Sequence, residues 1–293
     1  CRDWFQLCLK EGLTVFRDQE FSSDMRSRPV KRIADVRALR AAQFVEDAGP
    51  LAHPVRPETY REINNFYTAT VYEKGAELVR MVQTLIGKEK FRSGMDLYFA
   101  RHDGEAATVE QFIQCFADAS GHDMTQFMRW YSQAGTPAVT VSGRFDAARK
   151  TFILECAQAI PATPGQPSKE PMVIPLSIGL VGKDGRDLAL KAADGRPPEG
   201  RTIVLTEQTA KFEFAGIGES PVLSINRGFS APINLQTDLD TDDLAFLAAR
   251  DSDAFNRWQA LQTISMRLLL DNVAAARTGK PLREDDRLVQ AFA

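Results

Sequence analysis

Residues 2–20 read R-D-W-F-Q-L-C-L-K-E-G-L-T-V-F-R-D-Q-E, and this stretch decides how the first part of the chain folds. On a period of about 3.6 residues its apolar side chains fall on one side together with Glu11 and Asp18, which predicts a helix with a carboxylate inside its apolar stripe. Burying an unpaired carboxylate is costly, so Glu11 is expected to form a buried ion pair, to face a cleft or to bind a cation.

Beyond this helix, the spacing of apolar residues predicts a series of further helices. A polar connection is expected from Ser22 to Pro29, followed by a helix from Lys31 to Asp47. The prolines that come next forbid a regular helix over residues 51–60 and favour an extended segment. Thr108 and Gln111 have the spacing of a capping box that starts a later helix. Helices are predicted over residues 70–86, 88–101, 109–119 and 124–133.

From residue 138 onward, the period of the apolar residues changes to two, which is typical of strands. Short segments rich in Val, Ile, Leu and Phe are separated there by Gly, Pro and Asp turns, with no helix between them. These segments predict a small antiparallel β-sandwich. The predicted strands are residues 138–145, 151–158, 172–181, 188–191, 202–206, 211–214 and 222–226.

The last part of the sequence returns to helical spacing. Residues 230–240 are expected to be a linker, after which Thr241 and Ser252 are expected to cap two helices. The longer of these, over residues 253–277, carries an apolar stripe that needs a packing partner. The sequence therefore predicts the beginning of a further helical domain.

Composition limits the classes of function. The 293 residues exceed the usual size of one domain, with 44% apolar and 26% charged residues. A net charge of -3 argues against nucleic acid as a partner. No apolar run approaches the about 18 residues of a membrane span, so no membrane partner is expected and a cytoplasmic location is predicted.

The cysteines and histidines form no metal-binding pattern of their own. Cys1, Cys8, Cys115 and Cys156 are scattered without a C-x-x-C pair, and we expect them to be reduced thiols. The histidines include no pair at i and i+4. Because a zinc site needs about three protein ligands, this chain alone is not expected to build one.

A second informative stretch is N-N-F-Y-T-A-T-V-Y-E-K-G-A-E-L-V-R-M-V, residues 64–82. Thr70 and Glu73 have the spacing of a capping box, and Gly87 marks a stop, so a helix of about four turns is predicted with Tyr72 in its first turn. Taken alone, a tyrosine at this position is typical of a core residue whose hydroxyl reaches the surface.

Both stretches resemble one known family. L-K-E-G-L-T-V-F-R-D-Q-E-F at residues 9–21 and N-N-F-Y-x-x-x-V-Y-E-K-G-A at residues 64–76 are similar to blocks of the aminopeptidase N family, the gluzincin zinc metallopeptidases. W-Y-S-Q-A-G-T-P at residues 130–137 is similar to the end of that family's catalytic domain. The resemblance extends over essentially the whole chain and is strongest over residues 1–137.

The resemblance implies roles for individual residues. It assigns Glu11 as the third zinc ligand, following an H-E-x-x-H motif, and Tyr72 as the catalytic tyrosine. A phenol at that place can donate a hydrogen bond to the oxyanion that forms when zinc-activated water attacks a carbonyl. Asn64, Tyr67 and Glu73 would line the substrate cleft by the same resemblance.

Asp18 lies on the same helix face as Glu11, seven residues later. We assign it a supporting role, in which its carboxylate orients a zinc-bound histidine. The alternative is a surface ion pair with Arg17 or another neighbour. Both interpretations remain open at this point.

The implied fold is a multidomain α+β fold that begins inside a catalytic domain. Residues 1–136 would be the carboxyl-terminal helical part of a thermolysin-like peptidase domain, residues 137–236 a β-sandwich, and residues 237–293 the truncated beginning of a helical domain. The sequence contains neither H-E-x-x-H nor the substrate-binding G-x-M-x-N. Both histidine ligands are therefore expected upstream of Cys1, and the chain is interpreted as a fragment.

The implied function is that of a zinc aminopeptidase, which removes residues from the free amino terminus of peptides. The isolated chain is expected to be inactive, because the general base and two metal ligands are absent from it. The alternative is a non-catalytic helical and sandwich module for protein interaction, in which Glu11 and Tyr72 are structural.

Overall fold

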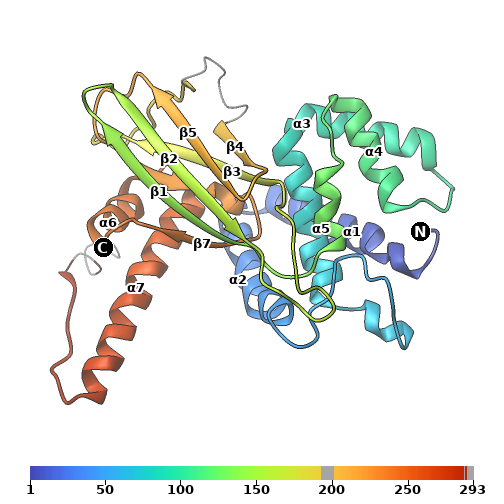
Figure 1. Cartoon of the computed structure of the whole chain (residues 1–293), viewed down its shortest axis with the longest axis horizontal. Helices are drawn as coiled ribbons and strands as arrows, with labels where there is room; N and C mark the ends of the chain where they lie inside the picture. The colour runs from blue at the N-terminus through green and yellow to red at the C-terminus, as the bar shows by residue number, and fades with distance from the viewer. Residues whose placement is uncertain (193–200, 287, 289–293) are drawn as a thin grey trace.

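The computed structural model describes residues 1–192, 201–286 and 288. It consists of a helical region, a β-sandwich and a final pair of helices. Figure 1 shows α3, α4 and α5 on one side of the sandwich, and α6 and α7 on the other. The multidomain α+β architecture expected from the sequence is confirmed.

The helical region contains most of the helices that the sequence predicts. Residues 51–62 form no helix, in agreement with their prolines. The short one-turn helices are η1 Trp4–Gln6, η2 Ile63–Phe66, η3 Thr70–Lys74 and η4 Gln126–Met128, and the α-helices are α1 Leu7–Met25, α2 Arg28–Asp47, α3 Gly75–His102, α4 Val109–Ser120 and α5 Arg129–Ser132.

Two predicted boundaries in this region are wrong. Helix α1 continues through the expected connection, since Ser23 is buried and its hydroxyl donates to the carbonyl of Gln19 at 2.7 Å. Thr70 forms no capping box with Glu73, because its hydroxyl donates to Glu46 Oε1 of α2 at 2.6 Å instead. Tertiary contacts override the local signal in both places.

Other local signals act as expected. The capping box of Thr108 and Gln111 starts α4, and Gly121 ends it in the left-handed conformation. Gly87, with φ +78°, interrupts α3 where the stop was predicted. The helix predicted over residues 124–133 is shorter, because Asp123 accepts the N–H of Thr125 and starts only the single turns of η4 and α5.

The sandwich has two sheets, with strand orders β5-β2-β1-β7 and β4-β3-β6. Six predicted strands are confirmed. The segment 188–191 is not a strand, since its backbone bonds are divided between Leu180 and Ala215. The strands are β1 Ala138–Asp146, β2 Thr151–Ala159, β3 Ile174–Val181, β4 Thr202–Leu205, β5 Thr209–Ala215, β6 Val222–Ile225 and β7 Asn234–Thr237.

Strand β7 falls inside the expected linker and corrects the prediction of a purely antiparallel sandwich. It pairs with β1 in parallel, with Ala138 opposite Asn234 and Val141 opposite Thr237. The other strand pairs are antiparallel.

One apolar core joins the helical region to the sandwich. Its largest buried side chains include Phe116 and Trp130 from the helices and Phe214 from β5. The indole of Trp130 donates to the carbonyl of Val173 at 2.7 Å, which satisfies its only polar group at this junction. The helical region is therefore held firmly against the sandwich.

The last described elements are α6 Thr241–Arg250 and α7 Ala254–Arg277. Their caps are Asp240 and Asp253 rather than the predicted Thr241 and Ser252, because a carboxylate at each neighbouring position accepts the free N–H. The second half of α7 exposes apolar side chains, namely Met266, Leu269, Leu270 and Val273. Among the described helices, none combines the length and the apolar character needed to cross a membrane.

Candidate active site

The first helix and the turn that carries Tyr72 meet at two glycines. A Cβ placed on Gly12 would lie 2.7 Å from the carbonyl carbon of Gly75, closer than real Cβ contacts. Helices α1 and α3 therefore approach backbone to backbone. This contact brings Glu11, just before Gly12, to the turn just before Gly75.

Glu11 and Tyr72 are brought together by this contact. The Tyr72 phenol lies close enough to Glu11 for the two groups to interact electrostatically. Partial burial, followed by the negative charge of Glu11, raises the pKa of the Tyr72 phenol. Tyr72 also packs against the main core, so the two interpretations of this residue, core and functional, describe different ends of one side chain.

Glu11 is buried, with 8% of its surface exposed, but it is not enclosed by fixed charges. Its ion-pair partner is the adjacent Lys10, whose Nζ lies 2.7 Å from Oε1 and whose side chain is 62% exposed. No arginine contacts Glu11 within residues 1–192 and 201–286. The charged partner of this buried carboxylate is therefore a solvent-exposed lysine.

Tyr67 lies beside Tyr72. The rings of Tyr67 and Tyr72 are 6.2 Å apart at an angle of 38°, and Tyr67 is 52% exposed. Asn64 is exposed in the single turn of η2, three residues before Tyr67. Both side chains are therefore accessible to solvent.

Glu73 faces a group of other acids. It is half-buried, and Gln19 Nε2 lies 3.4 Å from its Oε2. Burial first, and then the negative charges of Asp35, Glu77 and Asp18, raises the pKa of its carboxyl group. Asp35 is paired with Lys31, and Glu77 is paired with Arg32. Glu73 contacts an amide instead, so Glu73 itself is the carboxylate that could hold a cationic group.

Asp18 is exposed on α1. Across the described part of the chain it forms no ion pair with Arg17, so that alternative finds no support. Its charge acts on Glu73. Its supporting role toward a zinc-bound histidine stays a prediction.

A metal site would need ligands beyond those described here. The described residues contain no group of three or more His, Cys, Asp or Glu side chains that could hold a metal ion. The buried Glu11 carboxylate with its hydroxyl neighbour fits a single oxygen ligand of such a site. The four cysteines are free thiols, and all except Cys1 are buried.

Two contributors to the site escaped prediction from the sequence. Lys10 pairs with Glu11, and Gln19, two turns later on α1, contacts Glu73. Both lie in the same stretch as Glu11, and the helical period places Gln19 near its face. Only the position of η3 shows that Gln19 reaches Glu73.

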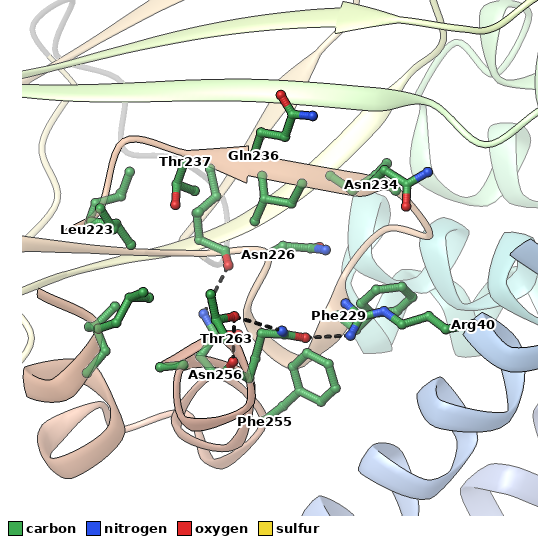
Figure 2. A pocket seen from close by; sticks show the side chains of 18 of the residues that line it. Arg40, Leu223, Asn226, Phe229, Asn234, Gln236, Thr237, Phe255, Asn256 and Thr263 are labelled. Carbon is green, nitrogen blue, oxygen red and sulfur yellow. Dashed lines mark hydrogen bonds between the residues drawn. The ribbon is translucent and has the colours of Figure 1, made fainter. Parts of the chain in front are cut away.

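A separate cavity of about 740 Å³ lies between the sandwich and α7. Figure 2 shows Asn234, Gln236 and Thr237 of β7 above it and Asn256 and Thr263 of α7 below it. None of the six predicted site residues lines this cavity. It is therefore distinct from the site around Glu11 and Tyr72.

Family models match most of this chain. Residues 1–131 match the family model described as the peptidase family M1 domain. Residues 135–238 match a domain of unknown function with an Ig-like fold (DUF3458), and residues 241–293 match its carboxyl-terminal companion, described as ARM repeats.

Relatives match over nearly the whole chain. It is 56% identical to aminopeptidase N of Caulobacter vibrioides over 277 residues, covering 94% of this chain and 31% of the relative. Aminopeptidase N of Escherichia coli is 47% identical over 292 residues, covering 100% of this chain and 33% of the relative.

A solved structure agrees as well. The crystal structure of Legionella pneumophila aminopeptidase A in complex with aspartic acid superposes with a TM-score of 0.80 at 27% identity, covering 99% of this chain and 30% of that one. This chain spans about a third of the length of the curated relatives it matches. With the M1 domain match, the paired Glu11 and Tyr72 and these identities, the chain belongs to the aminopeptidase N family of M1 peptidases.

Proposed function

We propose that this chain is the carboxyl-side part of the catalytic domain of a zinc aminopeptidase, followed by its β-sandwich and the start of its helical domain. The observation that supports this most is the closeness of Tyr72 to the buried Glu11, two residues that come from different elements. The alternative, a non-catalytic interaction module, gives no reason for a buried carboxylate whose ion-pair partner is an exposed lysine.

Glu11 is the proposed zinc ligand. When bound, the zinc ion would supply Lewis-acid activation of water and of the peptide carbonyl. Glu11 would offer one carboxylate oxygen from a buried position on α1, beside Tyr72. The H-E-x-x-H motif is absent from the sequence, so the histidine ligands and the general base would come from chain that precedes Cys1 in a longer protein.

Tyr72 is the proposed donor to the developing oxyanion. Its raised pKa keeps the phenol protonated at neutral pH, which is the state that can donate a hydrogen bond. A donor positioned before the reaction stabilises negative charge on the carbonyl oxygen more in the transition state than in the substrate. Turnover then depends on where this one hydroxyl lies.

The proposed substrate is a peptide with a free amino terminus. The Glu73 carboxylate would pair with its ammonium group, and Tyr67 and Asn64 would line the same cleft. Asp18 would orient a zinc-bound histidine. A cytoplasmic location, consistent with the free cysteines, belongs to the same proposal.

The isolated chain is proposed to be inactive. Its described residues supply one carboxylate where about three ligands are needed. A purified 293-residue chain is therefore expected to leave alanyl-p-nitroanilide unchanged, with or without added zinc. Hydrolysis that a chelator abolishes would contradict this expectation.

The proposed function is tested in a chimera, in which this chain replaces the matching segment of Caulobacter vibrioides aminopeptidase N. The chimera should hydrolyse alanyl-p-nitroanilide, and Glu11→Gln should lose both zinc and activity. Asp24→Asn is the matched control, because Asp24 is an exposed acid of the same helix paired only with Arg28. A Glu11→Gln chimera that keeps its zinc and its turnover would remove Glu11 from the metal site.

A further inference from the structure

The turn that carries Tyr72 has an unusual backbone. Residues Thr70–Lys74 form a single π-helical turn, in which the N–H of Gly75 donates to the carbonyl of Thr70. Such a turn contains one residue more than an α-helical turn, and it is frequent at functional sites. If it relaxed to an α-helix, Tyr72 would rotate away from Glu11. Something must therefore hold the π-turn in place.

The first end of the π-turn is held by the last turn of α2. Glu46 Oε1 accepts the backbone N–H of Thr70 at 2.8 Å and its hydroxyl at 2.6 Å. Gln43 Nε2 lies 3.3 Å from the same hydroxyl. Thr70 is fully buried, so this anchor is shielded from water.

The second end is held by a buried ion pair. Lys74 Nζ donates to Asp47 Oδ2 at 2.7 Å, and the two side chains are 1% and 0% exposed. Lys74 Nζ also lies 3.2 Å from the carbonyl of Gly135 and 5.8 Å from the ring centre of Trp130. The lysine therefore has every contact inside the protein.

Asp47 connects this anchor to the sandwich. Its Oδ1 accepts the N–H of Gly135 at 2.7 Å, and its Oδ2 accepts the hydroxyl of Thr136 at 3.0 Å. Thr136 and Pro137 lead directly into β1. One carboxylate thus contacts α2, the π-turn and the start of the sandwich.

We propose that Asp47 and Lys74 are positioning residues, which hold the π-turn in the register that places Tyr72 at Glu11. A buried ion pair is costly to desolvate, and apolar residues of similar volume often stabilise a fold equally well or better. Its directional bonds, in contrast, define one geometry. The proposal rests on the proposed function, since it assigns these residues an effect through Tyr72.

A double-mutant cycle in the Caulobacter chimera separates positioning from general stability. Asp47→Asn should lower kcat for alanyl-p-nitroanilide by about 10- to 100-fold, with KM and zinc content nearly unchanged, because a misplacement of about 1 Å can cost about 100-fold. Combined with Tyr72→Phe, it should add almost nothing, since the hydroxyl it positions is already gone. The neutral pair Asp47→Asn with Lys74→Gln should recover part of the lost kcat.

Glu77→Gln is the matched control. It removes the carboxylate of another buried ion pair on α3, with Arg32, only one turn after Lys74. It should lower the melting temperature by a similar amount, and its effect on kcat should multiply with that of Tyr72→Phe. If Asp47→Asn does not fold, Thr70→Val removes one hydroxyl at the other anchor, and its loss of kcat should also vanish beside Tyr72→Phe.

The outcomes distinguish the two proposals. A folded, zinc-loaded Asp47→Asn chimera with unchanged kcat would overturn the positioning role. The positioning role would also be overturned if the loss of kcat in Asp47→Asn multiplied fully with the loss in Tyr72→Phe. Unchanged turnover in Tyr72→Phe itself would instead overturn the proposed function.

Discussion

The helical region and the sandwich solve the problem of burial differently. The described residues include five buried charged side chains, and four of them lie in the helical region: Glu11, Asp47, Lys74 and Glu77. The fifth, Asp251, lies between α6 and α7, and no strand contains one. The described strands of the sandwich bury polar side chains such as Gln158 and Ser224 but no charged one. The buried charges of the helical region therefore indicate a role other than packing a core.

The largest expected effect comes from removing the cation of the buried pair. Lys74→Met leaves Asp47 charged and without its partner at 0% exposure, so the free energy of unfolding should fall by about 3–5 kcal/mol. Urea denaturation of the 293-residue chain at pH 7 measures this. A loss below 1 kcal/mol would show that the helical region tolerates uncompensated charge as well as the sandwich tolerates apolar changes.

Acid provides an independent check of the same pair. Lys74 outweighs burial and lowers the pKa of Asp47, so this carboxyl stabilises the fold above its unfolded pKa of about 4 and loses that effect as the pH falls through its folded pKa. In Lys74→Met, burial alone would raise that pKa, and protonation would relieve the unpaired charge. The difference in the free energy of unfolding between the unsubstituted chain and Lys74→Met should therefore become smaller as the pH falls. A difference that becomes larger at low pH would contradict the role of Lys74 as the partner that keeps Asp47 charged.

The next largest effect concerns catalysis rather than folding. Tyr72→Phe in the Caulobacter chimera should lower kcat about 100- to 1000-fold, because it removes one oxyanion donor, while zinc content and melting temperature change little. The phenylalanine ring keeps the packing against the core. Stopped assays at saturating substrate measure kcat, and metal analysis of the same samples measures the zinc content. A parallel loss of zinc would point to a role for the hydroxyl in holding Glu11.

A smaller effect is expected inside the sandwich. Ile178→Val removes one methylene from a fully buried position in β3, which should cost about 0.5–1.5 kcal/mol of stability. Because no catalytic group lies in the strands, kcat of the chimera should stay the same. A change in kcat would show that strain in the sandwich reaches the site. The sandwich would then affect catalysis as the helical region does.

The smallest effect is expected on the helix surface. Asp96→Asn breaks the exposed ion pair with Arg92 on α3, whose side chains are 60% and 80% exposed. Exposed pairs of this spacing contribute about 0.3–0.5 kcal/mol, and salt screens them. Thermal melts at low and high salt should differ little between the two proteins. A loss comparable to that of Lys74→Met would mean that exposure does not separate the two kinds of ion pair.

Local signals predicted part of this structure well. Gly121 and Gly87 act through their own backbone freedom, and the Thr108 capping box uses only neighbours in sequence, so each could be read without knowledge of the fold. Thr70 had an equally good local signal and failed, since Glu46 of another helix took its hydroxyl. Strand β7 escaped prediction because its strand partner within the described part of the chain, β1, is distant in sequence.

The site itself was predicted in a different way. Periodicity showed that Glu11 interrupts an apolar stripe, but its closeness to Tyr72 followed only from the resemblance of both blocks to one family. The structure brings these two together, with Tyr67 beside Tyr72. The Asp47–Lys74 pair belongs to no recognisable sequence motif. Its importance depends on the burial of both side chains, which no short stretch of sequence reveals.

The contact between Gly12 and Gly75 limits how this site can change over time. Since the spacing of the two helices there is set by bare backbone, even a methyl group at Gly12 would force the helices apart. A substitution at Gly12 therefore cannot change the distance between Glu11 and Tyr72 by a small step. A change in the shape of this region would therefore have to come from residues around the Gly12–Gly75 contact, because the contact itself has no room for a side chain.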